Sequence, residues 1–195
     1  MADKISPDRT LPDKTKLGVG LFLFSEAWFF LILLLTYMYF HSLPADGPGA
    51  ANSLNVMHTL VFSVCLFLSS ATIHLAAGSF QKGDRSGVNR WLGLTVALGA
   101  IFLFGQVREY LGLFAHSVTI STNLFGSTFF TLTGFHGLHV LVGLVALMAL
   151  LGIGMSGRFG DVKPSGFECV TMYWHFVDAV WVVIFTAVYV WPLIA

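Results

Sequence analysis

Five ionisable side chains stand inside long apolar stretches of this sequence, namely Glu26, His136, His139, His175 and Asp178. A charged group in membrane hydrocarbon costs at least ~2.5 kcal/mol, so such residues usually face protein or water and usually have a function. Carboxyl and imidazole groups can hold or pass on a proton. The pattern therefore indicates buried polar contacts that are either proton-linked or serve only to hold helices together.

The spacing of these residues places some of them on common helix faces. His175 and Asp178 are three residues apart, as are His136 and His139. Side chains three or four positions apart in a helix are neighbours on its surface. We therefore expect each pair to point in one direction.

The elements that carry these residues are long apolar runs. Apolar residues make up 56% of the 195 residues and charged residues only 10%, against about 25% charged in ordinary globular domains. A helix needs about 20 apolar residues to cross ~30 Å of hydrocarbon. The sequence predicts an all-α polytopic membrane protein with one five-helix transmembrane domain (17–195) after a polar tail (1–16). The expected helices are 17–40, 54–77, 91–113, 124–153 and 170–194.

The distribution of basic residues predicts the orientation of this bundle. Lys and Arg occur in the tail and in the segments 78–90 and 154–169, but not in the segments 41–53 and 114–123. Positively charged loops remain on the cytoplasmic side of a membrane. We therefore expect the N-terminus in the cytoplasm and the C-terminus outside.

Helix rise gives approximate depths for the ionisable residues. Glu26 lies about 14 Å along the first run, near the midplane, and His136 and His139 lie about 18 and 22 Å along the fourth. His175 and Asp178 follow in the inner half of the fifth. The similar depths favour one buried polar network containing all five residues, although depth does not by itself establish contact.

Other polar and aromatic residues are expected at the membrane surfaces. Arg108 and Glu109 are adjacent near the end of the third run, so they point in different directions and form an interface cluster. Arg108 and Arg158 are candidates for lipid headgroup contact, and Trp174 belongs to the aromatic residues that mark an interface. Within the fourth run, Gly134 and Gly137 would allow close helix approach.

The sequence offers little support for a bound cofactor or for nucleic acid. The formal net charge is zero, and the seven histidines are scattered in depth. The two cysteines form no metal-binding or haem-attachment spacing. We find no phosphate loop, nucleophile elbow or zinc-protease motif. We therefore expect no metal, no cofactor and no nucleic acid on this chain.

Four motifs together resemble subunit III of the haem–copper terminal oxidases, the cytochrome c oxidase subunit 3 family. They are SExxFF at 25–30, GQxxEY at 105–110, FGSTFFTLTGFHGLHVLVG at 125–143 and YWHFVDAVW at 173–181. The mitochondrial form of this subunit has seven helices. This sequence is similar to the shorter bacterial form, which lacks the first two.

The resemblance implies a non-redox accessory subunit in the cytoplasmic membrane of a bacterium, with haem and copper in partner subunits. It implies that subunits I and II and membrane phospholipid are partners, that the chain supports proton uptake, and that a larger respiratory supercomplex is a possible further partner. It also implies that Glu26 matches the buried carboxyl of the family, with His136, His139, His175 and Asp178 as the other matching positions.

Three other interpretations remain open. The same subunit of a quinol oxidase, or a homologue accompanying a nitric oxide reductase, would differ only in its partner subunits. A small proton-coupled transporter would use Glu26 and Asp178, although five helices do not divide into the usual repeats. A membrane haem protein would use a histidine as axial ligand.

Overall fold

Residues 13–41, 56–121, 123–158, 160 and 162–194 are described in the computed structural model. The long helices are α1 (Lys14–His41), α3 (Val56–Gln81), α4 (Arg85–Ala115), α5 (Leu124–Met155) and α6 (Pro164–Phe185). The last continues as a π-helical turn, η2 (Thr186–Val190), and a short α7 (Trp191–Ile194). In the described ranges there is no β-strand, and five helices are long and apolar enough to cross a membrane. The predicted all-α, five-helix fold is confirmed.

The helices α4 and α6 begin before the predicted apolar runs because their first residues lie in the polar flanks, whereas α5 begins at the predicted Leu124 and α3 begins two residues later than predicted. Asp84 caps α4 by accepting a hydrogen bond from the Gly87 amide at 3.0 Å. Asn123 caps α5 in the same way through the Gly126 amide at 2.8 Å. Pro164 stands at the start of α6, where its fixed φ suits the first helical turn. The helices α4 and α6 thus start several residues before the predicted positions.

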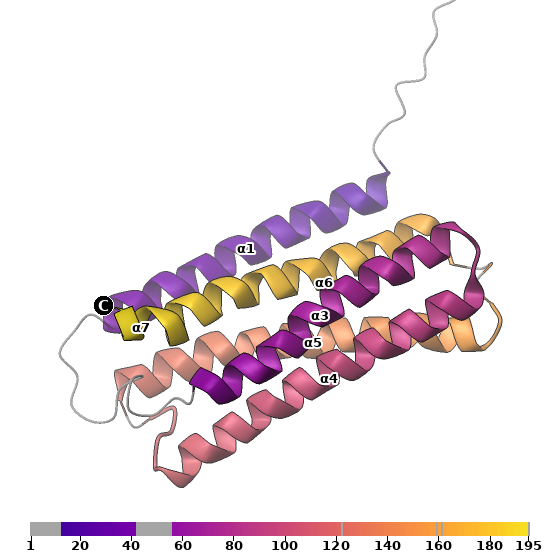
Figure 1. The fold of residues 1–195 in the computed structure, drawn as a ribbon. Helices are drawn as coiled ribbons and strands as arrows, with labels where there is room; N and C mark the ends of the chain where they lie inside the picture. The colour runs from indigo at the N-terminus through magenta and orange to yellow at the C-terminus, as the bar shows by residue number, and fades with distance from the viewer. Residues whose placement is uncertain (1–12, 42–55, 122, 159, 161, 195) are drawn as a thin grey trace, which may run out of the picture.

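The helices form one bundle with α1 at its edge (Figure 1). α3 packs on α4 and α6, and α5 packs on α4 and α6, whereas α1 packs on α5 and α6. Only Phe30 and Tyr37 are buried in α1. The first helix is therefore attached to the bundle along a narrow strip, and most of its surface faces outward.

Two tryptophans of α6 occupy the centre of the bundle. Trp174 and Trp181 are 1% and 0% exposed. Their indole N–H groups donate hydrogen bonds to Ser69 Oγ at 2.9 Å and to Ser63 Oγ at 2.8 Å in α3. Trp174 therefore lies in the interior and not at the lipid surface as expected, because its ring fills the space between α3, α4 and α5 and its N–H has a partner there.

Glycines on two helices make room for the Trp174 ring. A Cβ atom on Gly99 of α4 would lie 2.7 Å from Trp174 Cη2, and one on Gly143 of α5 would lie 2.8 Å from Trp174 Cε3. The expected close approach at Gly134 and Gly137 is absent, since their nearest neighbours would be 3.7 and 3.9 Å away. The tight packing against Trp174 occurs at Gly99 and Gly143 instead, because only a glycine there leaves room for the large indole ring.

We predict that Gly143→Ala destabilises the bundle by about 1–3 kcal/mol, the usual cost of overpacking a dense core. Gly137→Ala, six residues earlier in α5, is the matched control and should cost nothing, because its added methyl meets only Leu103 Cδ1 at 3.9 Å. Thermal unfolding of the two variants in the same detergent measures the difference. Equal stability of the two variants would contradict the assignment of Trp174 as the central packing element.

Candidate functional site

A carboxyl and an imidazole meet where α1, α5 and α6 join. Glu26 Oε2 lies 3.1 Å from His139 Nε2, and the two side chains are 21% and 15% exposed. His139 Nδ1 lies 2.7 Å from the carbonyl oxygen of Phe135. Tyr173 of α6 donates a hydrogen bond to the carbonyl oxygen of His139 at 3.1 Å. Three helices thus hold this pair in one place.

The hydrogen bonds of this pair determine where its protons can be. The Phe135 carbonyl only accepts, so His139 Nδ1 must carry a proton. A second proton is then needed between His139 Nε2 and Glu26 Oε2, and it belongs either to the imidazole or to the carboxyl. The pair can therefore hold a shared proton inside the bundle, in a charged or a neutral form.

His136, one turn from His139, does not join this pair. Its side chain is fully buried, and its ring stacks on Trp181 with centroids 4.8 Å apart and planes at 23°. The rings of Phe30 and Phe102 contact its edges. Neither ring nitrogen has a hydrogen-bond partner among the described residues. His136 therefore packs as an aromatic side chain in this chain.

His175 and Asp178 form a separate group with Ser70 of α3. Ser70 Oγ donates a hydrogen bond to Asp178 Oδ2 at 2.7 Å and lies 3.3 Å from His175 Nδ1. The carboxylate bonds the serine and not the histidine, so the three groups lack the order of a nucleophilic triad. The five residues expected in one network thus lie in different places: Glu26 with His139, His175 with Asp178, and His136 apart.

A third polar group, centred on Glu109, lies beside the first turn of α3 and the π-helical turn that follows α6. Glu109 Oε1 accepts a hydrogen bond from Thr59 at 2.8 Å, and Oε2 accepts from Tyr189 at 2.7 Å and Gln106 at 3.4 Å. Tyr189 lies in the π-helical turn η2, and such turns often place a functional or structural side chain. Glu109 thus points into the bundle and not toward headgroups, whereas the adjacent Arg108 is exposed.

Comparison with known proteins now adds to this geometry. The family model described as cytochrome c oxidase subunit III matches residues 8–193. The chain belongs to the cytochrome c oxidase subunit III family. The resemblance drawn from the four sequence motifs is therefore confirmed, and the chain is an accessory subunit of a haem–copper oxidase.

Several relatives cover most of this chain. It is 39% identical over 180 residues to cytochrome c oxidase subunit 3 of Synechocystis sp., covering 91% of this chain and 76% of the relative. It is also 39% identical over 197 residues to that of Corynebacterium diphtheriae, covering 96% and 95%. The identity to the protein of Thermostichus vulcanus is 34% over 183 residues, covering 92% and 88%.

The described part of this subunit III offers no obvious place for a metal. Within those residues, no three His, Cys, Asp or Glu side chains lie close enough together to hold an ion. The pair Glu26–His139 supplies only two possible ligands, and the His136 ring is enclosed by aromatic side chains.

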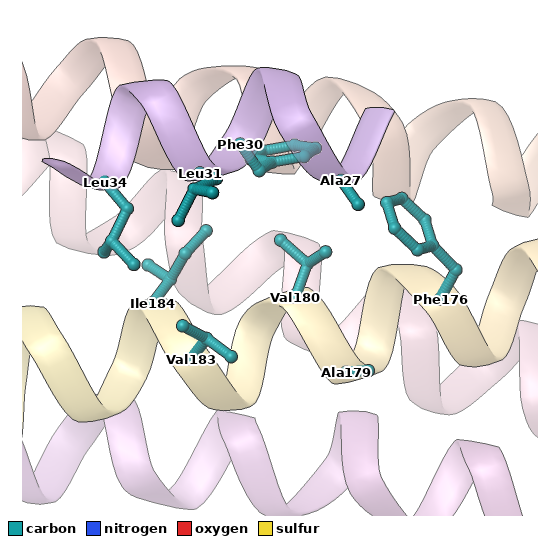
Figure 2. Close-up of a pocket in the computed structure, with 9 residues that line it drawn as sticks. All are labelled: Ala27, Phe30, Leu31, Leu34, Phe176, Ala179, Val180, Val183 and Ile184. Atoms are coloured by element: carbon teal, nitrogen blue, oxygen red, sulfur yellow. The ribbon is translucent and has the colours of Figure 1, made fainter. Parts of the chain in front are cut away.

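An apolar groove opens between α1 and α6 and begins at Ala27, the residue after Glu26. Figure 2 shows Ala27, Phe30 and Leu34 on one side and Phe176 and Val180 on the other. The space measures about 340 Å³, and its lining side chains are hydrocarbon throughout. Hydrocarbon chains fit such a surface, while water gains no hydrogen bonds there.

The N-terminal ends of α1 and α6 are joined by an ion pair between Lys16 and Glu168. Next to it, the Thr15 amide donates a hydrogen bond to Asp13 at 2.9 Å, and this bond lowers the pKa of the Asp13 carboxyl. Arg158, in the connection between α5 and α6, is exposed. The Lys16–Glu168 ion pair holds the first turn of α1 on α6.

The sequence alone did not indicate several partners of the polar residues. Ser70, Tyr173 and Thr59 are polar residues within apolar runs, so each could have been noted as a candidate. Their pairing depends on helix rotation, which the sequence pattern of an almost wholly apolar helix does not determine. The π-helical turn that directs Tyr189 inward has no sequence signal that we recognise.

We predict that Tyr189→Phe lowers the stability of the bundle by about 1–2 kcal/mol, because Glu109 loses a donor at a partly buried site. Tyr110→Phe is the control, since Tyr110 bonds the neutral hydroxyl of Thr133 at 2.8 Å. Its loss should be smaller because bonds to neutral groups contribute less than bonds to charged ones. Thermal unfolding in detergent measures both, and a larger loss for Tyr110→Phe would contradict the central role of Glu109.

Proposed function

We propose that this chain is the non-catalytic subunit III of a bacterial aerobic terminal oxidase of the cytochrome c oxidase type. In this proposal it stabilises subunit I, which carries haem and copper, beside subunit II, and it supports proton uptake during the reduction of oxygen to water. The observation that carries the proposal is the 3.1 Å contact between Glu26 and His139, a pair able to share a proton, in a chain of an oxidase subunit family.

The cofactors in this proposal belong to the partner subunits. Among the described residues no three His, Cys, Asp or Glu side chains lie close enough together to hold an ion, and this proposal places the haem and copper in subunit I. The contribution of this chain would then be mechanical and electrostatic. It would brace the catalytic subunit, exclude water around its own core and keep a protonatable pair at a constant position.

Phospholipid is the expected small partner of this chain. The groove between α1 and α6 is hydrocarbon-lined and suits an acyl chain. Arg108 and Arg158 are exposed near opposite ends of the bundle and suit contact with headgroup phosphates. Both features support bound lipid on this subunit.

The proposed location is the cytoplasmic membrane of a bacterium, with the N-terminus in the cytoplasm. The alternation of Lys and Arg between connecting segments supports this orientation. The Lys16–Glu168 ion pair would then lie at the cytoplasmic surface, and Glu109 would lie toward the outside. The Glu26–His139 pair would lie between them, accessible to protons from the cytoplasmic half.

The electron donor and the wider assembly depend on the partner subunits. The relatives named cytochrome c oxidase subunit 3 favour cytochrome c over quinol. A nitric oxide reductase homologue and membership in a respiratory supercomplex also depend on partners. A transporter using Glu26 and Asp178 together is less well supported, because the two carboxyls belong to different polar groups.

The decisive experiment is purification through a tag on this chain in mild detergent, followed by reduced-minus-oxidised spectra and subunit identification. We expect haem and copper to copurify with larger subunits and to be absent when this chain is isolated. A copper-bearing partner would identify cytochrome c as the donor. Purification of the chain alone would contradict the proposal and favour a transporter, and haem retained by the isolated chain would contradict the assignment of cofactors.

We predict that Glu26→Ala leaves the initial turnover within about twofold of the wild type, because Glu26 touches no reacting atom. Faster inactivation during turnover, or fewer protons pumped per electron, is expected as the proton-holding pair is lost. Oxygen consumption over many turnovers and proton release by reconstituted vesicles measure these effects.

Glu26→Gln separates the two possible roles of the pair. The Gln amide can still donate a hydrogen bond to His139 Nε2, but it cannot release a proton. Behaviour like Glu26→Ala would assign the effect to the proton, and behaviour like the wild type would assign it to packing. Complete loss of oxygen reduction in a fully assembled Glu26→Ala complex would contradict the accessory role.

A further inference from the structure

A second pocket lies at the end of the bundle where α3 ends and α4 and α6 begin. It opens between the connection from α3 to α4 and the connection from α5 to α6, and its volume is about 430 Å³. Its lining shares no residue with the groove between α1 and α6 or with the Glu26–His139 pair. The pocket is therefore a separate candidate site.

The floor of this pocket is apolar. Phe80 of α3 and Val162 line it together with Val88 of α4, whose side chain is only 1% exposed. The Phe80 ring is held in place because it stacks on Phe167 of α6, with centroids 4.5 Å apart and planes at 10°. The pocket thus offers a fixed hydrocarbon surface to which water cannot hydrogen-bond.

The pocket also carries a cation. Arg85, the first residue of α4, lines it, and Arg85 Nη1 donates a hydrogen bond across to the carbonyl oxygen of Gly157 at 3.4 Å. A guanidinium has five N–H donors, so others remain for a further acceptor. Arg85 forms no ion pair with a described carboxylate, and the adjacent Asp84 accepts from the Gly87 amide instead. The positive charge of Arg85 is therefore available to an anion.

The position of the pocket along the bundle corresponds to the lipid headgroups. Trp91 follows Arg85 by six residues in α4, which is about 9 Å along the helix axis. Tryptophan is enriched at the boundary between hydrocarbon and headgroups. In the orientation proposed above, the pocket faces the cytoplasmic leaflet, and basic pockets between transmembrane helices on that side bind anionic lipid headgroups.

The combination of one cation with an apolar floor selects the class of ligand. A phosphate group can accept two parallel hydrogen bonds from a guanidinium. A free phosphate ion would gain this contact but would leave the hydrocarbon of the floor uncovered. A lipid phosphate carries a glycerol and the upper carbons of its acyl chains, and covering apolar surface with them is favourable.

We propose that the pocket beside Arg85 binds the headgroup of an anionic phospholipid. The phosphate lies on the Arg85 guanidinium, and the glycerol and the upper acyl carbons lie on Phe80, Val88 and Val162. This inference rests on the proposed function for the orientation of the chain in the membrane. It adds a lipid site apart from the groove between α1 and α6, and it specifies a negatively charged headgroup.

Photolabelling of the whole complex tests this site. The complex, purified through a tag on this chain, is reconstituted in phosphatidylcholine vesicles that contain a phosphatidylglycerol probe with a diazirine close to its glycerol. After irradiation, mass spectrometry identifies the labelled peptides, and we expect labels in the segments 80–88 and 162–167. Arg85→Gln should lower this labelling about fivefold, the effect of one basic residue at a membrane surface.

Two further variants separate the pocket from its surroundings. Arg90→Gln is the matched control, because Arg90 is also exposed in α4 and lies five residues later on another face of the helix. It should leave the labelling unchanged. Val162→Trp keeps every charge but takes up space in the pocket, so it should lower the labelling as Arg85→Gln does.

Four results would overturn the assignment of this site. Equal losses in Arg85→Gln and Arg90→Gln would assign the labelling to general surface charge, and unchanged labelling of Val162→Trp would place the lipid outside the pocket. Equal labelling by a phosphatidylcholine probe would show that the headgroup charge is not recognised. Protection by an excess of inorganic phosphate would assign the site to the free ion.

The same preparation distinguishes this inference from the proposed function. If the haem-bearing subunit copurifies with the wild-type chain but the pocket is not labelled, the lipid site alone is wrong. If no haem-bearing subunit copurifies, the proposed function fails, and the labelling of this chain is still measured.

Discussion

The need to satisfy polar groups within hydrocarbon governs this bundle. Inside a membrane a side chain cannot turn to water, so each serine, tryptophan or carboxyl must find a partner in the protein. The N–H groups of Trp174 and Trp181 find theirs in Ser69 and Ser63, and these bonds hold α6 against α3. The rotation of α6 about its axis follows from these contacts, and the rotation determines where every other side chain of α6 points.

The consequences of that rotation extend to both sides of α6. With its tryptophans inward, α6 directs His175 and Asp178 toward the edge of α3, and it directs Phe176 and Val180 toward α1. One side becomes a polar surface near the middle of the membrane, and the other becomes one wall of an apolar groove. Within the YWHFVDAVW motif, this packing thus places Trp174 and Trp181 in the interior and His175 and Asp178 beside α3.

The first helix depends on few contacts. It has two buried residues and is linked to its neighbours by the Lys16–Glu168 ion pair and by Glu26 with His139. An ion pair at the surface contributes at most about 1 kcal/mol, whereas a buried hydrogen-bonded pair is strongly destabilised when one partner is removed. Because Glu26 and His139 also link α1 to α5, loss of Glu26 would remove a helix–helix contact together with a protonatable group, and a Gln variant is needed to separate the two.

The sequence by itself determined the class of the protein, the number of helices and the family. Long apolar runs can only span a membrane as helices, and motifs such as YWHFVDAVW are specific enough to identify relatives. It also singled out Glu26, His139, His175 and Asp178, because ionisable groups are rare in such runs. Only the tertiary structure decided which of these residues meet, that Trp174 is central, that Glu109 points inward and that His136 packs among aromatic rings. Those facts depend on helix rotation and on a π-helical turn, and a helix that is apolar on all sides carries no periodic signal that would determine its rotation.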